Sequence, residues 1–285
     1  MQTKTCSLWL TLAFVACRSI PASLQLAAQE AAPESTTKAE ARQAMELAIA
    51  EVVHWKFGSV GLMETELELV QSPLMRWSNP AVGRVYGSVY LLTDENRPQA
   101  IICPYKWFSP YTGFEMECRS LSAIGVKGVR GDKTVWSTTR PGIEWKLVPS
   151  DPPVGQTATE RQRQLKTIAQ EFTAELLDTR TNQDGEDQRL RQLTQPVFRY
   201  ECLSQNVLEG GVVAFVVGTD PELFLLIEAT ESEGDRFWQY ALARMNSDRL
   251  AVRHREKEVW RVERLTLEKM RDQKEPYFIF EISQK

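Results

Sequence analysis

Histidine is scarce in this sequence, and the motifs that define common enzyme classes are missing. The 285 residues include 2 histidines, His54 and His254, and neither stands at a spacing that builds a metal site. His254 lies in a charged run, which is typical of an exposed strand. The chain also lacks G-x-S-x-G, H-E-x-x-H, C-x-x-C and a Gly-rich phosphate loop. We therefore expect no catalytic histidine, no metal and no cofactor.

An excess of basic charge is missing as well. The 34 Lys and Arg residues and 38 Asp and Glu residues are interspersed and give a net charge of −4. Such a chain presents no basic field to a polyanion, so we expect no nucleic-acid partner. With 42% hydrophobic and 25% charged residues, its composition is that of a globular protein with a core.

No apolar run reaches the roughly 20 residues that a membrane-spanning helix needs. The apolar stretch at residues 8–16 (LWLTLAFVA) follows Lys4 and precedes small residues, a pattern typical of a signal peptide. We predict a signal peptide over residues 1–28, cleavage after Ala28, and a periplasmic or secreted protein. Lipid attachment at Cys17 is the alternative, and it is the one route by which we expect the mature chain to meet a membrane.

Cysteine is sparse after this cleavage, since only Cys103, Cys118 and Cys202 remain. At most one internal disulfide can then form. If Trp107 faces Phe114 across a hairpin, Cys103 faces Cys118 on the inner face of the sheet. We therefore predict a buried thiol pair or a structural disulfide between Cys103 and Cys118.

Helix-start signals occur twice, on either side of a Pro-rich stretch at residues 149–156. Before this stretch, Thr37 and Glu40 fit a capping box, in which each side chain bonds the backbone N–H of the other residue. After it, Thr157 and Glu160 fit a second box. We expect a helix to follow each one.

Apolar stripes at helical spacing follow both boxes. The stripes comprise Met45, Ala48, Ile49 and Val52 in the first half, and Leu165, Ile168, Ala169 and Phe172 in the second. We expect each stripe to pack against a sheet, because a lone amphipathic helix of this length is marginal in water.

Short segments of alternating polarity, rich in β-branched and aromatic residues, then predict strands. They cover residues 85–93, 100–107, 114–121, 212–217, 223–229 and 237–244. Their connections are too short for parallel crossovers, so we expect antiparallel meanders. Residues of similar type keep their order between the halves, for example Arg76 with Arg199 and Trp136 with Trp260.

The sequence thus predicts an α+β protein of two repeated units, each an N-terminal helix packed on an antiparallel β-meander sheet. We place a flexible tether at residues 29–36, the first unit at 37–148, the Pro-rich linker at 149–156 and the second unit at 157–285. The alternative is a single α+β domain with two dissimilar halves.

Aromatic residues of the first half are the candidate binding residues. Tyr105, Trp107 and Tyr111 lie close together in the sequence, and Trp77 belongs to the same half. Aromatic side chains can line a groove for a sugar or an apolar ligand, so we predict that these four bind a ligand. Filling of a small core is the alternative.

Glu115 and Glu117 stand two residues apart on one predicted strand and share a face. They could perform acid–base chemistry, or they could form an outward polar row beside the apolar one. Without a catalytic motif, the sequence favours a non-enzymatic envelope protein that binds a small molecule, a polysaccharide or a protein between its units. A hydrolase that uses strand-borne carboxylates is the alternative.

Three stretches of the second half resemble a family of predicted exported bacterial proteins of unknown function. They are residues 195–201 (QPVFRYE), 218–222 (GTDPE) and 238–245 (WQYALARM). No activity is attached to that family, so the resemblance supplies no site residue.

Overall fold

The computed structural model describes residues 31–60, 65–150, 152–177 and 187–283. Its contacts divide the chain into a unit that ends at Ala39 and a compact unit from Glu40 to Lys285. The predicted signal peptide and Cys17 lie outside the described residues. No helix in the described ranges is both long and apolar enough to cross a membrane.

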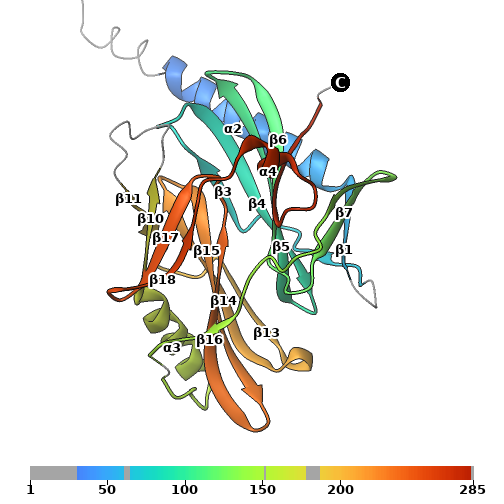
Figure 1. Ribbon diagram of the computed structural model, residues 1–285. Coiled ribbons are helices and arrows are strands. Elements are labelled where there is room, and N and C mark those ends of the chain that lie inside the picture. The colour runs from blue at the N-terminus through green and yellow to red at the C-terminus, as the bar shows by residue number, and fades with distance from the viewer. Residues whose placement is uncertain (1–30, 61–64, 151, 178–186, 284–285) are drawn as a thin grey trace, which may run out of the picture. The chain divides into compact units, whose positions relative to one another are not determined.

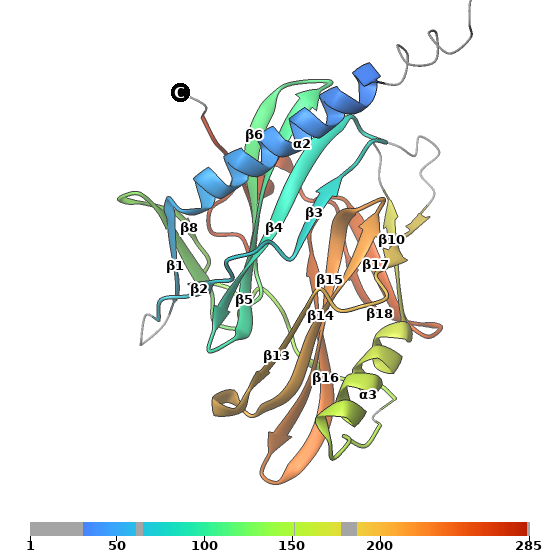
Figure 2. The same cartoon turned by 180° about the vertical axis from the view of Figure 1, so that it is seen from behind.

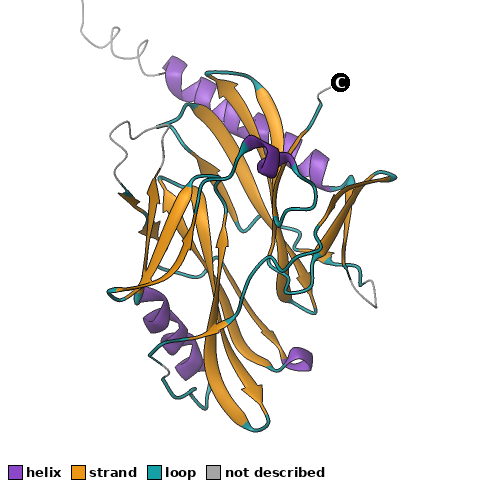
Figure 3. Cartoon of the chain, in the orientation of Figure 1, coloured by secondary structure: helices purple, strands orange, loops and turns teal. Residues whose placement is uncertain are grey.

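The fold is mixed α and β, and its strands pair antiparallel (Figures 1 and 3). The strands pair antiparallel because the connections between them are too short for parallel crossovers, as expected from the sequence. The described part of the chain has three α-helices, which are α2 (Ala31–Val52), α3 (Ala158–Gln170) and α4 (Leu267–Arg271).

Two large sheets of six strands each form the centre of the compact unit. In the first, the order is β19 (Tyr277–Glu281), β6 (Gly113–Ser120), β5 (Arg97–Ser109), β4 (Arg84–Asp94) and β2 (Glu68–Leu69), and β3 (Met75–Ser78) also pairs with β4. In the second, the order is β9 (Lys146–Leu147), β16 (Asp235–Arg244), β15 (Asp220–Ser232), β14 (Val207–Val217) and β12 (Arg191–Gln192), and β13 (Phe198–Cys202) also pairs with β14.

The edge strands of the two large sheets are exchanged between the halves of the chain. β9 ends the first half and pairs with β16 of the second, through Lys146 opposite Tyr240. β19 ends the second half and pairs with β6 of the first, through Tyr277 opposite Arg119. Each large sheet therefore contains one strand from the other half.

Two smaller sheets complete the architecture. One consists of β1 (Trp55–Ser59), β7 (Val126–Arg130) and β8 (Lys133–Ser137). The other consists of β11 (Gln188–Arg189), β10 (Phe172–Leu177), β17 (Arg249–His254) and β18 (Lys257–Val262). Both small sheets are visible beside the large ones from the two sides of the molecule (Figures 1 and 2).

Three clusters of buried apolar side chains hold the layers together. The central cluster joins the two large sheets, with Leu91 and Cys103 from one and Val212 and Phe224 from the other. An outer cluster packs α2 from Glu40 onward and the small sheet of β1 against the first large sheet. The third packs α3 and the small sheet of β10 against the second large sheet. Each large sheet is thus covered on both faces.

The second helix forms as predicted. Thr157 is the N-cap of α3, its side chain accepts from the Glu160 N–H, and the Glu160 carboxylate accepts from the Thr157 N–H. Leu165, Ile168 and Ala169 are buried against the sheet. Phe172, the last residue of the expected stripe, is buried as the first residue of β10.

The first helix differs from the prediction at its start and on its face. It begins at Ala31, so the expected tether is helical from residue 31 and Thr37 is no cap. Pro33 fits there, because the first turn needs no backbone donor. The buried apolar positions recur every fourth residue, at Ala44, Ala48 and Val52, which leaves Ile49 49% exposed.

The predicted pairing of Cys103 with Cys118 is wrong. Trp107 faces Gly113 instead of Phe114, so Cys103 lies opposite Glu117 and Cys118 lies opposite Ile102. A shift of one residue turns every side chain of a strand to the other face. Cys103 therefore packs in the central cluster and Cys118 in an outer one, and both are free and buried.

The two helix faces predict different responses to an aspartate. Ile168→Asp puts an unpaired charge at a side chain that is 2% exposed, and we expect it to lower the free energy of unfolding by at least about 3 kcal/mol. Ile49→Asp is the matched control on a largely exposed position, with an expected loss of about 1 kcal/mol or less. Urea denaturation of both variants measures this, and equal losses would contradict the assignment of the two faces.

Candidate functional site

A pocket of about 200 Å³ lies between the two large sheets. We call it the intersheet pocket. β3, β5 and β6 of the first sheet line it on one side, and β15 and residues 245–247 line it on the other, and β19 and α4 also contribute to the lining. Its walls therefore come from both halves of the chain.

All four predicted binding residues line the intersheet pocket: Trp77, Tyr105, Trp107 and Tyr111. Trp77, Tyr105 and Trp107 are buried and also belong to the central cluster. Tyr111, in the connection between β5 and β6, is 55% exposed. The three buried rings therefore belong both to the core and to the wall of the pocket, while Tyr111 lies at the rim of the pocket.

Packing fixes the aromatic wall. The Trp77 ring lies over Gly87 on the neighbouring strand, where an added Cβ would come within 2.3 Å of the ring. Trp77 Nε1 donates to Cys103 Sγ at 3.1 Å, and the ring centroids of Trp77 and Tyr105 are 5.9 Å apart. Rings held in this way present a preformed surface.

Carboxylates enter the pocket from both sheets. Glu115 and Glu117 lie opposite Tyr105 and Cys103, so they share the inward face of the first sheet. The interpretation of these two as an outward polar row is wrong, because the one-residue shift in register turns them toward the second sheet. β15 contributes Asp220 and Glu222 from the other side.

The carboxylates are anchored by neighbouring donors. Tyr105 Oη donates to Glu115 Oε2 at 2.7 Å, and Arg271 pairs with the other oxygen of Glu115. Tyr277 Oη donates to Glu117. Burial, together with the nearby charge of Glu117, raises the pKa of Tyr105 and of Tyr277 well above the usual value, so both phenols remain protonated donors.

The opposite wall is anchored by amides. Asn79 Nδ2 donates to Asp220 Oδ2 at 3.1 Å, and the Asn246 side chain donates to Glu222. Among the residues that line the pocket, Arg271 is the one basic side chain beside four carboxylates. The pocket therefore combines aromatic faces with carboxyl groups held by hydrogen bonds, which suits sugar hydroxyls or a cation.

No family model, no curated protein and no solved structure matches this chain. The function of the pocket has to be judged from its own geometry and chemistry.

Neither histidine takes part in the pocket. His254 is buried, not exposed as its charged surroundings indicate: Nε2 lies 2.7 Å from Glu171 Oε2, and the ring packs on Phe172. His54 lies exposed beyond the end of α2. Within the described ranges, no three His, Cys, Asp or Glu side chains are placed to hold a metal ion.

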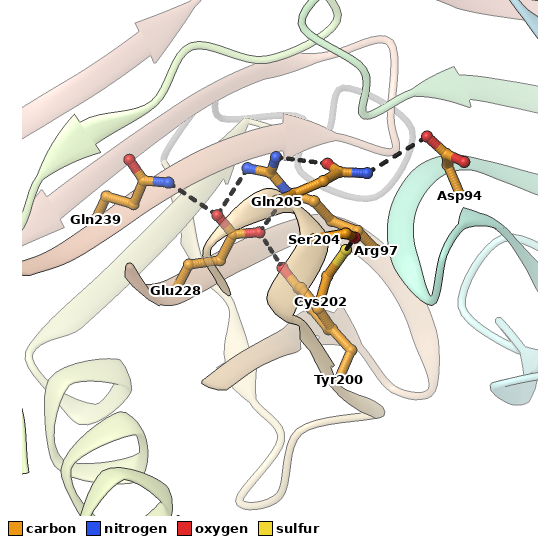
Figure 4. Close-up of polar contacts among 8 residues, drawn as sticks. All are labelled: Asp94, Arg97, Tyr200, Cys202, Ser204, Gln205, Glu228 and Gln239. Carbon is orange, nitrogen blue, oxygen red and sulfur yellow. Dashed lines mark hydrogen bonds and ion pairs between the residues drawn. The ribbon is translucent and has the colours of Figure 1, made fainter. Parts of the chain in front are cut away.

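A second polar cluster lies where the turn between β4 and β5 meets the second large sheet (Figure 4). The Arg97 guanidinium donates to both oxygens of Glu228, each at 2.8 Å. Tyr200 Oη and Gln239 Nε2 also donate to Glu228, at 2.9 and 2.8 Å. Gln205, in the 3₁₀-helix η1 (Leu203–Gln205), accepts from Arg97 at 3.0 Å.

The sequence holds no signal for this cluster, since Arg97 and Glu228 lie in different halves and no motif contains them. The Glu228 side chain has no exposed surface. A buried carboxylate of this kind is stable only with such partners.

Loss of Arg97 is expected to be costly. Arg97→Met leaves the Glu228 charge buried without its cation, and we expect the free energy of unfolding to fall by about 3–5 kcal/mol. Arg42→Met is the matched control, because Arg42 is 71% exposed and pairs with the exposed Glu46 on the same helix. Denaturant unfolding compares the two, and an equal small loss would mean that the buried pair contributes no more than a surface one.

Proposed function

We propose that this chain is an exported, non-enzymatic ligand-binding protein and that the intersheet pocket is its binding site. The observation that carries the proposal is the convergence of Trp77, Tyr105, Trp107 and Tyr111 on one cavity whose floor and far wall carry carboxylates. The sequence of residues 1–28 supports export. Sequencing of the mature N-terminus tests that part, since a retained Met1 in a cytoplasmic protein would exclude it.

The hydrogen bonds of Glu115 favour ligand binding over catalysis. Both oxygens of Glu115 are engaged, one by Tyr105 and one by Arg271, which suits a fixed acceptor more than a group that exchanges protons. Rigid aromatic walls lower the entropy cost of binding. The pocket is thus built to hold a ligand in one orientation.

A hydrolase remains the second candidate, because Glu117 and Glu222 approach the same cavity from opposite sheets. Two carboxylates on either side of a substrate bond are the minimum for acid–base hydrolysis. Turnover of a glycoside or ester substrate that disappears in Glu117→Gln would favour this function over simple binding.

We further propose that the chain consists of two repeated units, each with an N-terminal helix and an antiparallel sheet. The strand order of one large sheet matches that of the other, including the exchanged edge strands. Backbone hydrogen bonds also match. Leu121 N donates to Gln99 O as Met245 N does to Glu222 O, and Val148 N donates to Trp238 O as Ile282 N does to Phe114 O.

Side-chain packing supports the repeat. The ring of Tyr200 lies over Gly210 as the ring of Trp77 lies over Gly87, and an added Cβ would come within 2.4 Å of it. The helices, however, correspond differently from the stripes expected from the sequence. Gly131 N donates to His54 O just after α2, and Arg255 N donates to Glu171 O just after α3. When the two helices are aligned by these bonds, Ala48 takes the position of Leu165.

Tyr111 offers a test of the binding site. Because it lies at the rim and is largely exposed, Tyr111→Ala removes an aromatic contact without a cavity in the core. We expect the affinity for a ligand found by a fluorescence screen of sugars, amines and carboxylic acids to fall about tenfold. Phe108→Ala, a nearby aromatic that does not line the pocket, is the control. Equal affinity in the two variants would place the ligand elsewhere.

The exchanged edge strands predict that the halves stay together when the linker is cut. With a protease site inserted after Pro152, cleavage should leave one complex of both fragments in size-exclusion chromatography, because β9 and β19 each remain paired in the other half's sheet. Denaturant should be needed to separate the fragments. Separation on cleavage alone would argue against the strand exchange.

A further inference from the structure

Arginines gather in the lining of a second pocket, of about 330 Å³, which we call the arginine pocket. Its walls come from β6 and β19 of the first large sheet, β16 of the second and β18 of a small sheet, together with residues 140–144. The arginines are Arg119, Arg140 and Arg244. Apolar side chains form much of the remaining wall, among them Ile143, Leu242, Trp260, Val262 and Leu265.

The carboxylates in this lining already have basic partners. Glu275 pairs with Arg140, whose side chain is 60% exposed. Glu144 Oε2 lies 3.4 Å from Lys146 Nζ, and both side chains are exposed. Neither glutamate therefore serves as the partner of Arg119 or Arg244.

Arg244 is buried and held in place by the backbone. Its guanidinium donates to the carbonyl oxygens of Asn246, Asp248 and Glu263. Burial lowers the pKa of Arg244, and the charge of Asp248 offsets this only in part. The Asp248 carboxylate also lies 3.0 Å from Arg264 Nε, so two cations share it.

Arg119 is buried as well, and the chain satisfies it less completely. One terminal nitrogen donates to the carbonyl oxygen of Gly142, and the Nε–H group has no acceptor in the part of the chain that the structure describes. Burial, and then the charge of Arg244, lower the pKa of Arg119 to about 9, and no carboxylate is among the groups that act on it. A buried cation normally has a counter-charge, so its place beside a second buried arginine calls for an explanation.

We propose that the arginine pocket binds a small organic carboxylate, which pairs with Arg119 in the field of Arg244 and packs its apolar body against Trp260 and Leu265. Guanidinium groups match carboxylates in geometry and bind them strongly when both are shielded from water. The apolar wall favours such a ligand over inorganic phosphate. This inference goes beyond the proposed function, because it assigns a second site, and among the lining residues Tyr277 alone belongs to both pockets.

Benzoate is the probe, and benzyl alcohol, which has nearly the same shape without the charge, is its control. Titration calorimetry of the full chain at low salt should show saturable binding of benzoate, with benzyl alcohol at least about tenfold weaker. Arg119→Met removes the cation and should weaken benzoate binding at least about tenfold. Arg42→Met, which removes an exposed charge outside the pocket, should leave it unchanged.

Thermal unfolding separates a binding role of Arg119 from a structural one. Because the cation is poorly satisfied in the chain alone, Arg119→Met should leave Tm unchanged or raise it. A fall in Tm with unchanged benzoate affinity would show a structural role and overturn the site.

A second variant tests the pocket without touching Arg119. Leu265→Glu adds a carboxylate to the wall and should also weaken benzoate binding. Leu203→Glu, at a position that is 67% exposed and outside the pocket, is its control. Absence of saturable benzoate binding, equal affinity for benzyl alcohol, or full binding by both Arg119→Met and Leu265→Glu would overturn the inference. Binding that is lost in Tyr111→Ala instead would place benzoate in the intersheet pocket, so the proposed function would stand and this site would not.

Discussion

The contact between the two large sheets determines what the rest of the chain can do. Each sheet has one face in the central cluster and the other under a helix and a small sheet. Strands covered on both faces need nearly continuous apolar sequence, as in residues 212–217 (VVAFVV) and 223–227 (LFLLI). A polar group in such a contact has to find its partners within it.

Both polar clusters at this contact meet that requirement in the same general way. In each cluster a tyrosine hydroxyl donates to a carboxylate. Tyr200 donates to Glu228 in one cluster, and Tyr277 donates to Glu117 in the other. The clusters differ in the residue that carries the guanidinium: Arg97 of the opposite sheet pairs with Glu228 in the first cluster, and Arg271 of α4 pairs with Glu115 in the second.

Local signals predicted the parts of the fold that depend on local chemistry. The capping box of Thr157 and Glu160 and the stripe after it act within one or two turns of helix, so the sequence suffices for α3. The Thr37 box was misleading, because a helix that starts earlier makes the same residues part of its interior. The cysteine pair failed on a single residue of register, which the sequence of a hairpin connection does not determine when several turn lengths are possible.

The lining of the candidate site was predictable in part for a similar reason. Tyr105, Trp107 and Tyr111 are neighbours in the sequence, and strand alternation brings two of them to one face. Asp220 and Glu222 come from the other sheet, so only the tertiary packing could reveal them. The same holds for β9, which has two residues and carries no periodic pattern of its own.

The exchange of β9 and β19 has a consequence for how the chain reaches its folded state. β19 follows the other described strands in the sequence, yet it completes the sheet that contains β2, β3 and β4. Until β19 has been synthesised, β6 is an unpaired edge, open to any strand that can add to it. Closure of the first large sheet therefore depends on a long-range contact, which slows folding. At high concentration, the β19 of a second molecule can compete for that edge, so the same feature that joins the halves also provides a route to domain-swapped dimers.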